Sequence, residues 1–340
     1  MPSVTPHPRP QRRGALSLLV AFAVVVTVLA GASTPAGGQE SAAPGRLQVP
    51  FSTLSAALAG ILRPGASPPG ANDPDCRLSA LRPRPVVLVH GLTSNMGVNW
   101  DSVAPLLANE GFCVFALTYG VTPGAAFPLD QVGGLTSIES SALELASFVD
   151  DVRTATGAAD VDLVAQSEGT VVVQQYLKFL EGAEVVNSFV ALTPLYRGTD
   201  VAGLAQIRAL GTDLLPLLLP PVESAVAALC AACPQFLNGS AFLDRLNADG
   251  VAAAGVRYTN IVTRFDELVV PFTSGLIDSP GVTNHVLQDL CALDLADHVA
   301  VAFDPVAADL VLAALDPTPM APPGCRLVLP GVGSPLAARL

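Results

Sequence analysis

Residues 161–169 read Val-Asp-Leu-Val-Ala-Gln-Ser-Glu-Gly. The apolar run Val161–Ala165 predicts a buried strand, and the pattern over Gly169–Leu180 predicts a helix that follows without a linker. Between them, Ala165-Gln166-Ser167-Glu168-Gly169 matches the pattern Gly-x-Ser-x-Gly, with Ala in the first position. Such a turn admits only small residues where strand and helix nearly touch, and it exposes its serine at a helix N-terminus that favours negative charge. A serine that merely caps the helix is the alternative.

Short β-branched runs alternate with helical patterns over most of the chain from Pro85 onward. The predicted strands are Val86–Val89, Val114–Thr118, Val161–Ala165, Val185–Leu192, Val256–Val262 and Thr283–Leu287. The predicted helices are Asp101–Glu110, Ser137–Thr156, Gly169–Leu180 and Pro305–Leu315. This alternation is typical of parallel strands joined by crossover helices, and nearly continuous apolar runs indicate a sheet covered on both faces. The predicted fold class is therefore α/β, with a mostly parallel, doubly wound sheet.

A second motif, His90-Gly91-Leu92, ends the first predicted strand. In an architecture with this strand–turn–helix serine, the loop at that place donates one backbone N–H to an oxyanion, and the residue after the serine donates another. The sequence therefore predicts Leu92 and Glu168 as the two N–H donors.

A serine nucleophile needs a base, and the chain has four histidines. His7 lies in an N-terminal segment that we predict to be removed. His90 precedes Ser167, whereas the expected chain order is serine, acid, histidine. His285 falls inside an alternating strand pattern, which favours a structural role. His298 lies in the loop before the last predicted helix, so we predict that it is the base.

The acid that orients the histidine should follow the strand before it. Asp266, three residues beyond Thr263, occupies that place, and Glu267 is its nearest rival. Serine, histidine and a carboxylate together suit nucleophilic catalysis without a cofactor.

The N-terminal segment has the three parts of a secretory signal. Arg12 and Arg13 precede the apolar run Leu16–Leu29, and Ala30-Gly31-Ala32 supplies the small residues of a cleavage site. We predict a signal peptide over residues 1–32, cut after Ala32, and therefore a secreted, extracellular protein. An uncleaved membrane anchor is the alternative, because the apolar stretch is barely long enough to span a bilayer.

Composition excludes several classes of protein. A chain with 51% hydrophobic and 14% charged residues is not disordered. With one long apolar stretch it is not a polytopic membrane protein. The net charge is −12, and several of the arginines precede that stretch, so we expect no binding to nucleic acid.

Six cysteines follow the predicted signal: Cys76, Cys113, Cys230, Cys233, Cys291 and Cys325. An even number in an exported chain predicts disulfides throughout, although the count does not choose the pairing. Cys230 and Cys233 lack the second cluster or nearby histidines of a zinc site, so no metal is expected.

The remaining intervals divide the chain. Residues 33–73, rich in Pro, Ala, Gly and Ser, predict an N-terminal arm packed on a domain over 74–325, and residues 326–340 form a C-terminal tail. The interval 197–250 is too long for an ordinary connection. Composition leaves open a buried subdomain or an apolar cap; we favour the cap. Its predicted substrate-binding residues are Leu214, Leu215, Leu217, Leu218 and Leu219.

Several stretches together carry a family resemblance: 68–73 with Cys76, 86–92, 111–120, 263–267, 288–291 and 297–307. In this order they resemble the secreted actinobacterial lipases and esterases called lipase class 2, which belong to the α/β-hydrolase superfamily. The resemblance covers most of residues 68–325 and implies the α/β-hydrolase fold. It implies a triad of Ser167, Asp266 and His298, with Leu92 and Glu168 as oxyanion donors. It also implies the disulfides Cys76–Cys113 and Cys291–Cys325, which leaves Cys230–Cys233 as a short third bridge.

The serine turn departs from the family pattern Gly-His-Ser-Gln-Gly-Gly at Ala165, Gln166, Glu168 and Thr170. The Glu168 carboxylate would oppose a developing oxyanion if it faced the site, whereas its backbone N–H is unchanged. We therefore expect activity to persist with an altered pH profile.

The expected function is secreted carboxylic ester hydrolysis by a lipase that acts on triacylglycerol or another lipid ester through an acyl-serine intermediate. One alternative is an acyltransferase that uses the same triad; another is a catalytically silent protein that binds a lipid or a cell-envelope partner. The expected partner is a lipid or small ester, with transient contact at a lipid interface. The sequence specifies no oligomeric state.

Overall fold

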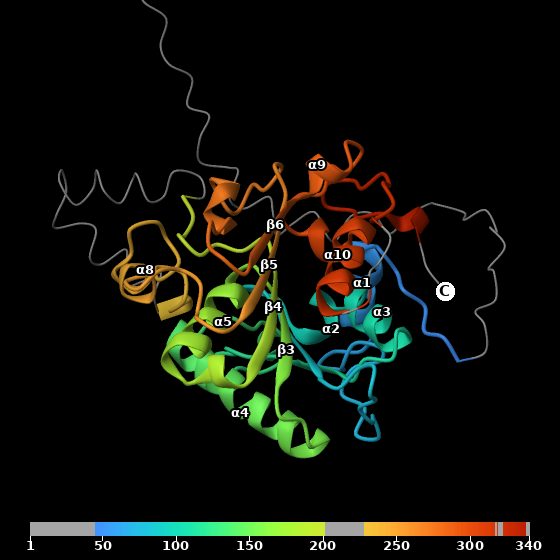
Figure 1. The fold of residues 1–340 in the computed structure, drawn as a ribbon, viewed down its shortest axis with the longest axis horizontal. Helices are drawn as coiled ribbons and strands as arrows, with labels where there is room; N and C mark the ends of the chain where they lie inside the picture. The colour runs from blue at the N-terminus through green and yellow to red at the C-terminus, as the bar shows by residue number, and fades with distance from the viewer. Residues whose placement is uncertain (1–44, 201–227, 317, 319–321, 338–340) are drawn as a thin grey trace, which may run out of the picture. The chain divides into compact units, whose positions relative to one another are not determined.

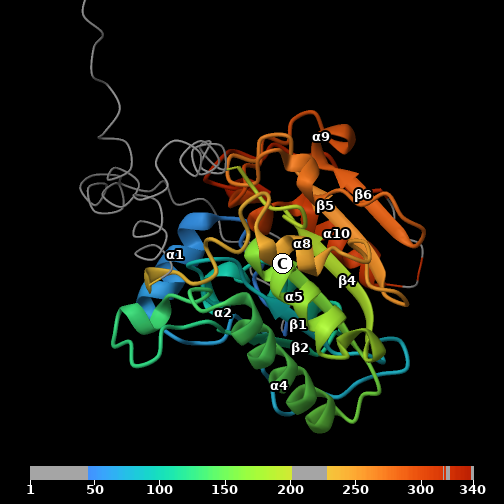
Figure 2. The ribbon, with the colours of Figure 1, turned by 90° about the vertical axis from the view of Figure 1, so that its left-hand side faces the viewer.

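A parallel sheet of six strands forms the centre of the protein in the order β2-β1-β3-β4-β5-β6 (Figures 1 and 2). The computed structural model describes residues 45–200, 228–316, 318 and 322–337. The strands are β1 (Val86–Val89), β2 (Val114–Leu117), β3 (Val161–Gln166), β4 (Val186–Leu192), β5 (Arg257–Val262) and β6 (Val282–Val286). The predicted strands are confirmed, apart from small shifts at their ends. No end shifts by more than one residue; Leu287, for example, begins the short helix α9 (Leu287–Leu290) instead of ending β6.

Helices cover both faces of the sheet (Figures 1 and 2). The two longest helices of one face are α4 (Ile138–Thr156) and α5 (Glu168–Phe179), whereas the other face carries α3 (Val103–Asn109) and α10 (Pro305–Leu315). The side chains of β1 alternate between the two layers: Val87 and Val89 join the cluster that includes α4 and α5, and Val86 and Leu88 join the other. The doubly wound α/β class is therefore confirmed.

The order of the strands places two loops side by side. From β1 the chain passes to β2 at one edge and returns to β3 on the opposite side of β1. Ligands of such sheets bind at this reversal, outside the carboxyl ends of the strands. The loop after β1 contains His90–Leu92, and the turn after β3 contains Ser167.

The N-terminal arm and the C-terminal segment pack on this domain and on each other. Val49 and Phe51 of the arm are buried, and Ser52 caps helix α1 (Thr53–Leu62) by accepting from the Ser55 N–H. The Ser334 N–H donates to the Phe51 carbonyl at 2.8 Å. The short helix α2 (Met96–Asn99) contacts α1. The segment 326–337 thus contacts the N-terminal arm at Phe51.

The predicted signal peptide over residues 1–32 lies outside the described residues. Within the part of the chain that the structure describes, no helix has both the length and the apolar character needed to span a membrane.

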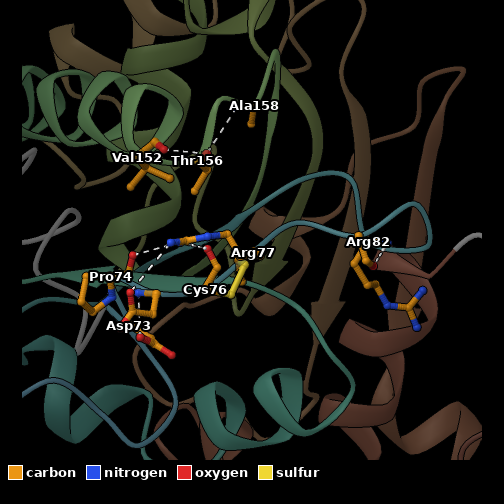
Figure 3. The surroundings of a disulfide bond; sticks show 11 residues. Asp73, Pro74, Cys76, Arg77, Arg82, Val152, Thr156 and Ala158 are labelled. Carbon is orange, nitrogen blue, oxygen red and sulfur yellow. Dashed lines mark hydrogen bonds and ion pairs between the residues drawn. A yellow bond between two sulfur atoms is a disulfide. The ribbon is translucent and has the colours of Figure 1, made fainter.

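Three disulfides join Cys76 to Cys113, Cys230 to Cys233 and Cys291 to Cys325, and these are the pairs implied by the family resemblance. Figure 3 shows the surroundings of Cys76, where Arg77 Nη1 donates to the carbonyl oxygens of Pro74 at 3.3 Å and Cys76 at 3.1 Å. The first bridge therefore joins Cys76, three residues beyond the predicted arm, to Cys113, the residue before β2.

Candidate active site

Ser167 stands alone between β3 and α5 with a backbone φ of 53° and ψ of −127°. A non-glycine residue adopts positive φ only where its surroundings hold it there, and such residues cluster at functional sites. Around it the backbones nearly touch. A Cβ on Gly169 would lie 2.4 Å from the carbonyl oxygen of His90, and one on Gly91 would lie 3.1 Å from Ser167 Cβ. The small residues at this turn are thus a steric requirement.

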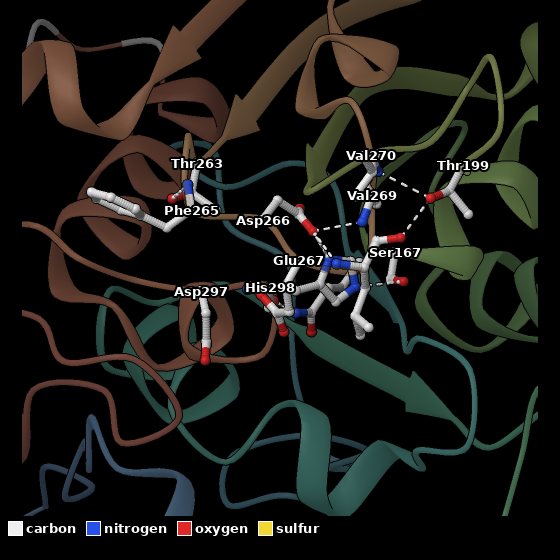
Figure 4. A network of polar contacts seen from close by, with 12 residues as sticks. Ser167, Thr199, Thr263, Phe265, Asp266, Glu267, Val269, Val270, Asp297 and His298 are labelled. Carbon is white, nitrogen blue, oxygen red and sulfur yellow. Dashed lines mark hydrogen bonds and ion pairs between the residues drawn. The ribbon is translucent and has the colours of Figure 1, made fainter. Parts of the chain in front are cut away.

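A hydrogen-bonded chain runs from Ser167 through His298 to Asp266 (Figure 4). His298 Nε2 lies 2.8 Å from Ser167 Oγ, and His298 Nδ1 lies 2.9 and 3.0 Å from the two carboxylate oxygens of Asp266. The histidine and aspartate side chains are only 5% and 2% exposed. The structure therefore brings together the three side chains predicted as a triad.

The Asp266 carboxylate is held by the turn that follows β5. Its Oδ1 accepts from the backbone N–H groups of Leu268 at 3.1 Å and Val269 at 2.7 Å. Thr199 Oγ1 braces the same turn, since it donates to the Leu268 carbonyl at 2.6 Å and accepts from the Val270 N–H at 3.0 Å. Sequence reasoning missed Thr199, which lies far from the turn along the chain.

The loop that carries His298 is held by hydrogen bonds to the backbone N–H and to the carbonyl of this residue. The His298 N–H donates to Glu267 Oε2 at 3.1 Å, and the His298 carbonyl accepts from Gln166 Nε2 at 3.0 Å. Glu267, the rival candidate for the acid, thus contacts the backbone of His298, while Asp266 contacts the ring.

Gln166 also connects this loop to the loop after β1. Its Oε1 accepts from Asn99 Nδ2 at 2.7 Å, and Asn99 Oδ1 accepts from the Gly91 N–H at 3.2 Å. Both amide side chains are buried. Sequence reasoning missed Asn99. The available signal was that Gln166, its hydrogen-bond partner, departs from the family pattern.

Leu92 and Glu168, the predicted N–H donors, line one cleft together with Ser167 and His298. Among the described residues, neither backbone N–H donates to another group of the protein. Two free donors therefore adjoin Ser167, as the stabilisation of an oxyanion requires.

The cleft has a volume of about 410 Å³. Its apolar lining consists of Leu92, Val98, Leu195, Phe236, Leu268, Val269, Val299 and Phe303. The predicted cap leucines between Leu214 and Leu219 lie outside the described residues. Of the interval 197–250, Thr199 and Phe236 line the cleft, whereas helix α8 (Ala241–Leu246) buries Phe242 and Leu243 in the core cluster that includes α5.

The side chain of Glu168 is buried beside Tyr119, whose hydroxyl lies 3.0 Å from Glu168 Oε2. Burial raises the pKa of Glu168 to about 8, and the contact with Tyr119 opposes this shift only in part. Whether Glu168 places a negative charge near the developing oxyanion therefore depends on whether its carboxyl group is protonated.

Two other histidines have structural places. His90 is fully buried, and burial lowers its pKa to about 4. Its Nε2 accepts from the Tyr119 N–H at 3.2 Å, so its Nδ1 carries the proton and donates to the Gly91 carbonyl at 2.8 Å. His285 lies within β6, as its alternating pattern predicts.

Among the residues that the structure describes, no group of three or more His, Cys, Asp and Glu side chains is placed to hold a metal ion.

The family model described as Lipase (class 2) matches residues 83–311. No curated protein matches the chain in sequence. Among solved structures, Aspergillus fumigatus lipase B is similar with a TM-score of 0.51 and 20% identity, over 73% of this chain and 59% of that one. The mature form of Bacillus licheniformis lipase BlEst2 gives a TM-score of 0.51 and 15% identity, over 72% of this chain and 96% of that one. The chain thus spans about three fifths of the Aspergillus protein, and both likenesses show the shared α/β-hydrolase fold.

Proposed function

The chain belongs to the class 2 lipase family, and from this premise we propose that it is a secreted carboxylic ester hydrolase in which Ser167 is the nucleophile. The observation that carries the proposal is the continuous chain from Ser167 Oγ to His298 and Asp266, beside which two backbone N–H groups donate to no other group that the structure describes. Nucleophile, base, orienting acid and oxyanion donors are the parts that acyl transfer to serine requires.

The geometry supports a two-step reaction. His298 Nε2 removes the Ser167 proton as Oγ attacks the ester carbonyl, and Asp266 stabilises the imidazolium through Nδ1–H. The Leu92 and Glu168 N–H groups bind the tetrahedral oxyanion. The intermediate then collapses to an acyl-serine, and the alcohol leaves with the proton from His298. Water, deprotonated by the same histidine, attacks the acyl-serine and releases the carboxylic acid.

The lining of the cleft supports a lipid ester as the substrate, such as a triacylglycerol. Leu195, Phe236 and Val299 present apolar surface beside Ser167. Each methylene that such a surface covers contributes about 0.8 kcal/mol, so acyl chains of medium or greater length are favoured over acetate.

Export is supported by the cysteines. All six form disulfides, which persist in oxidising compartments outside the cytosol. Together with the signal pattern of residues 1–32, this supports an extracellular protein.

Hydrolysis of a p-nitrophenyl ester of medium chain length tests the proposal. We expect Ser167→Ala and His298→Ala each to lose roughly 10³-fold or more in kcat, with a smaller loss in Asp266→Asn. The matched controls are Ser147→Ala, on the exposed face of α4, and His285→Ala, within β6. Turnover that survived in Ser167→Ala, or that depended on His285 in place of His298, would contradict the proposal.

A further inference from the structure

The Tyr119 hydroxyl lies between two oxygen atoms. Its Oη is 2.7 Å from the backbone carbonyl of His90 and 3.0 Å from Glu168 Oε2. A phenol has one proton to donate, and a carbonyl oxygen has none. One of the two contacts therefore needs a proton from elsewhere.

Only the Glu168 carboxyl group can supply that proton. If Glu168 is un-ionised, it donates to Tyr119 Oη, and Tyr119 donates to the His90 carbonyl, so both contacts are hydrogen bonds. If Glu168 is ionised, Tyr119 can donate to only one of the two acceptors. The lone pairs of Tyr119 Oη then face those of the other acceptor oxygen at hydrogen-bond distance. In addition, Glu168 Oε1 is buried and has no hydrogen-bond partner among the described residues, which a carboxylate tolerates poorly.

The described groups around Glu168 offer it no positive charge. The His90 ring stacks on Tyr119 with a centroid separation of 4.3 Å and is neutral, because its Nε2 accepts a backbone N–H. Glu144 of α4 accepts from the Gly120 N–H and adds negative charge near Tyr119. On the other side of the turn are His298 and Asp266, already paired with each other. In the described part of the chain, no lysine or arginine forms an ion pair with Glu168.

We propose that Glu168 is an un-ionised acid in the active enzyme, that its proton positions the oxyanion loop through Tyr119 and the His90 carbonyl, and that loss of this proton switches hydrolysis off. The inference rests on the proposed function, because it concerns the same site. Glu168 acts here as a positioning residue through its side chain, in addition to the proposed role of its backbone N–H.

The effect on hydrolysis follows from the position of the negative charge on ionised Glu168. A Cβ on Gly134 would lie 2.4 Å from Glu168 Oε2 and 3.1 Å from Leu92 Cα, so the carboxyl group lies close to the backbone of the proposed oxyanion donor. When the proton leaves to solvent, a negative charge remains next to the place where the oxyanion develops, and it opposes that oxyanion. Burial raises the pKa of Glu168 to about 8, which sets the pH range of the switch.

The first test measures the proton directly. In protein labelled with ¹³C at the glutamate carboxyl carbons, NMR should show one carboxyl group that is un-ionised at neutral pH and titrates near pH 8. Its signal should be missing in Glu168→Gln. A wild-type spectrum in which every glutamate is ionised at neutral pH would overturn the inference, and this result needs neither activity nor a folded variant.

The second test measures kcat/KM against pH, with the rate of Ser167→Ala subtracted as background. Ionisation near pH 8 should lower the wild-type value about tenfold between pH 7 and pH 9. Glu168→Gln, whose amide also donates to Tyr119 and cannot ionise, should lack this decline whatever its rate at pH 7. Glu144→Gln removes a nearby charge on an exposed position and should keep the decline.

The outcomes separate the two proposals. An alkaline decline that is the same in Glu168→Gln and in wild type overturns the inference alone. Hydrolysis that does not depend on Ser167 overturns the proposed function, and the NMR titration then still decides the protonation state of Glu168.

Discussion

Gln166 Nε2 donates a hydrogen bond of 3.0 Å to the backbone carbonyl of His298. Through Asn99 the same side chain also reaches the Gly91 N–H. The loop of the proposed base and the loop of a proposed oxyanion donor are therefore connected by two buried amides, those of Gln166 and Asn99. Since such buried amides keep their geometry only when every partner is present, they hold the two loops in one arrangement.

We expect Gln166→Ala and Asn99→Ala each to lower kcat by about 10–100-fold with little change in KM, because a small displacement of the base from Ser167 is costly. The double variant should lose little more than either single variant, since the chain is broken once. Steady-state kinetics of the four proteins checks this.

Gln174→Ala is the control for this cycle. Gln174, on α5, is likewise a buried amide, but its hydrogen bonds are to Val251 and Tyr258, away from Ser167. It should lower stability and spare kcat. Additive losses in the double variant, or an equal loss of kcat in Gln174→Ala, would show that the amides do not act as one chain.

The disulfide Cys291–Cys325 should stabilise both the fold and the site. It closes a separation of 34 residues, so replacing both cysteines with alanine should lower the free energy of unfolding by about 3–4 kcal/mol. The bridge begins shortly before His298, and we therefore expect kcat to fall as well. The control removes Cys230–Cys233, whose separation of 3 residues predicts a smaller loss of stability. Denaturant unfolding of both variants measures the two losses of stability. An equal or larger loss on removal of the short bridge would contradict the prediction.

Asp304 should make the stability of the protein depend on pH. Burial raises its pKa well above the usual range, and the negative charge of Asp294 raises it further. A carboxyl group with a raised pKa in the folded state contributes stability that is present below its unfolded pKa and is lost as the pH rises toward the folded pKa.

Asp304→Asn removes this dependence and keeps the oxygen that accepts from the Val306 N–H at the start of α10. The variant should therefore gain stability relative to wild type as the pH rises from about 4 toward neutrality. Urea unfolding across that range measures the difference, with the exposed Asp244→Asn as control. A difference that stays constant with pH would exclude Asp304 as the cause.

Phe236 should set the preference for acyl chain length, because it is the apolar side chain that the described part of the 197–250 interval contributes to the cleft. We expect Phe236→Ala to lower kcat/KM for long-chain esters by roughly 10–100-fold and to spare acetate esters. Phe127→Ala, at a side chain that is 68% exposed and does not line the cleft, is the matched control. Equal losses on acetate and long-chain esters would mean that Phe236 does not bind the acyl chain.

The sequence predicted what local patterns specify. Apolar runs located the strands, because each parallel strand is buried on both faces. The small residues around Ser167 marked the tight turn, and chain order selected Asp266 and His298. The first two signals lie within a few residues of the features that they predict, whereas the third is the order of the motifs along the chain.

The features that escaped prediction depend on contacts between distant segments. Glu168 was recognised as unusual, but its partner Tyr119 lies 49 positions earlier. Gln166 and the His298 carbonyl are separated by 132 positions. No periodicity reports such a pair, because the contact exists only after both loops reach the same end of the sheet.

The most direct measurement of the central claim is covalent labelling of Ser167. A fluorophosphonate reacts with a serine only where a base and oxyanion donors activate it. We predict a single adduct per chain, found by mass spectrometry on the peptide that contains Ser167, and its loss in both Ser167→Ala and His298→Ala. Folded wild-type protein that acquires no adduct, or that carries it on another residue, would contradict the account.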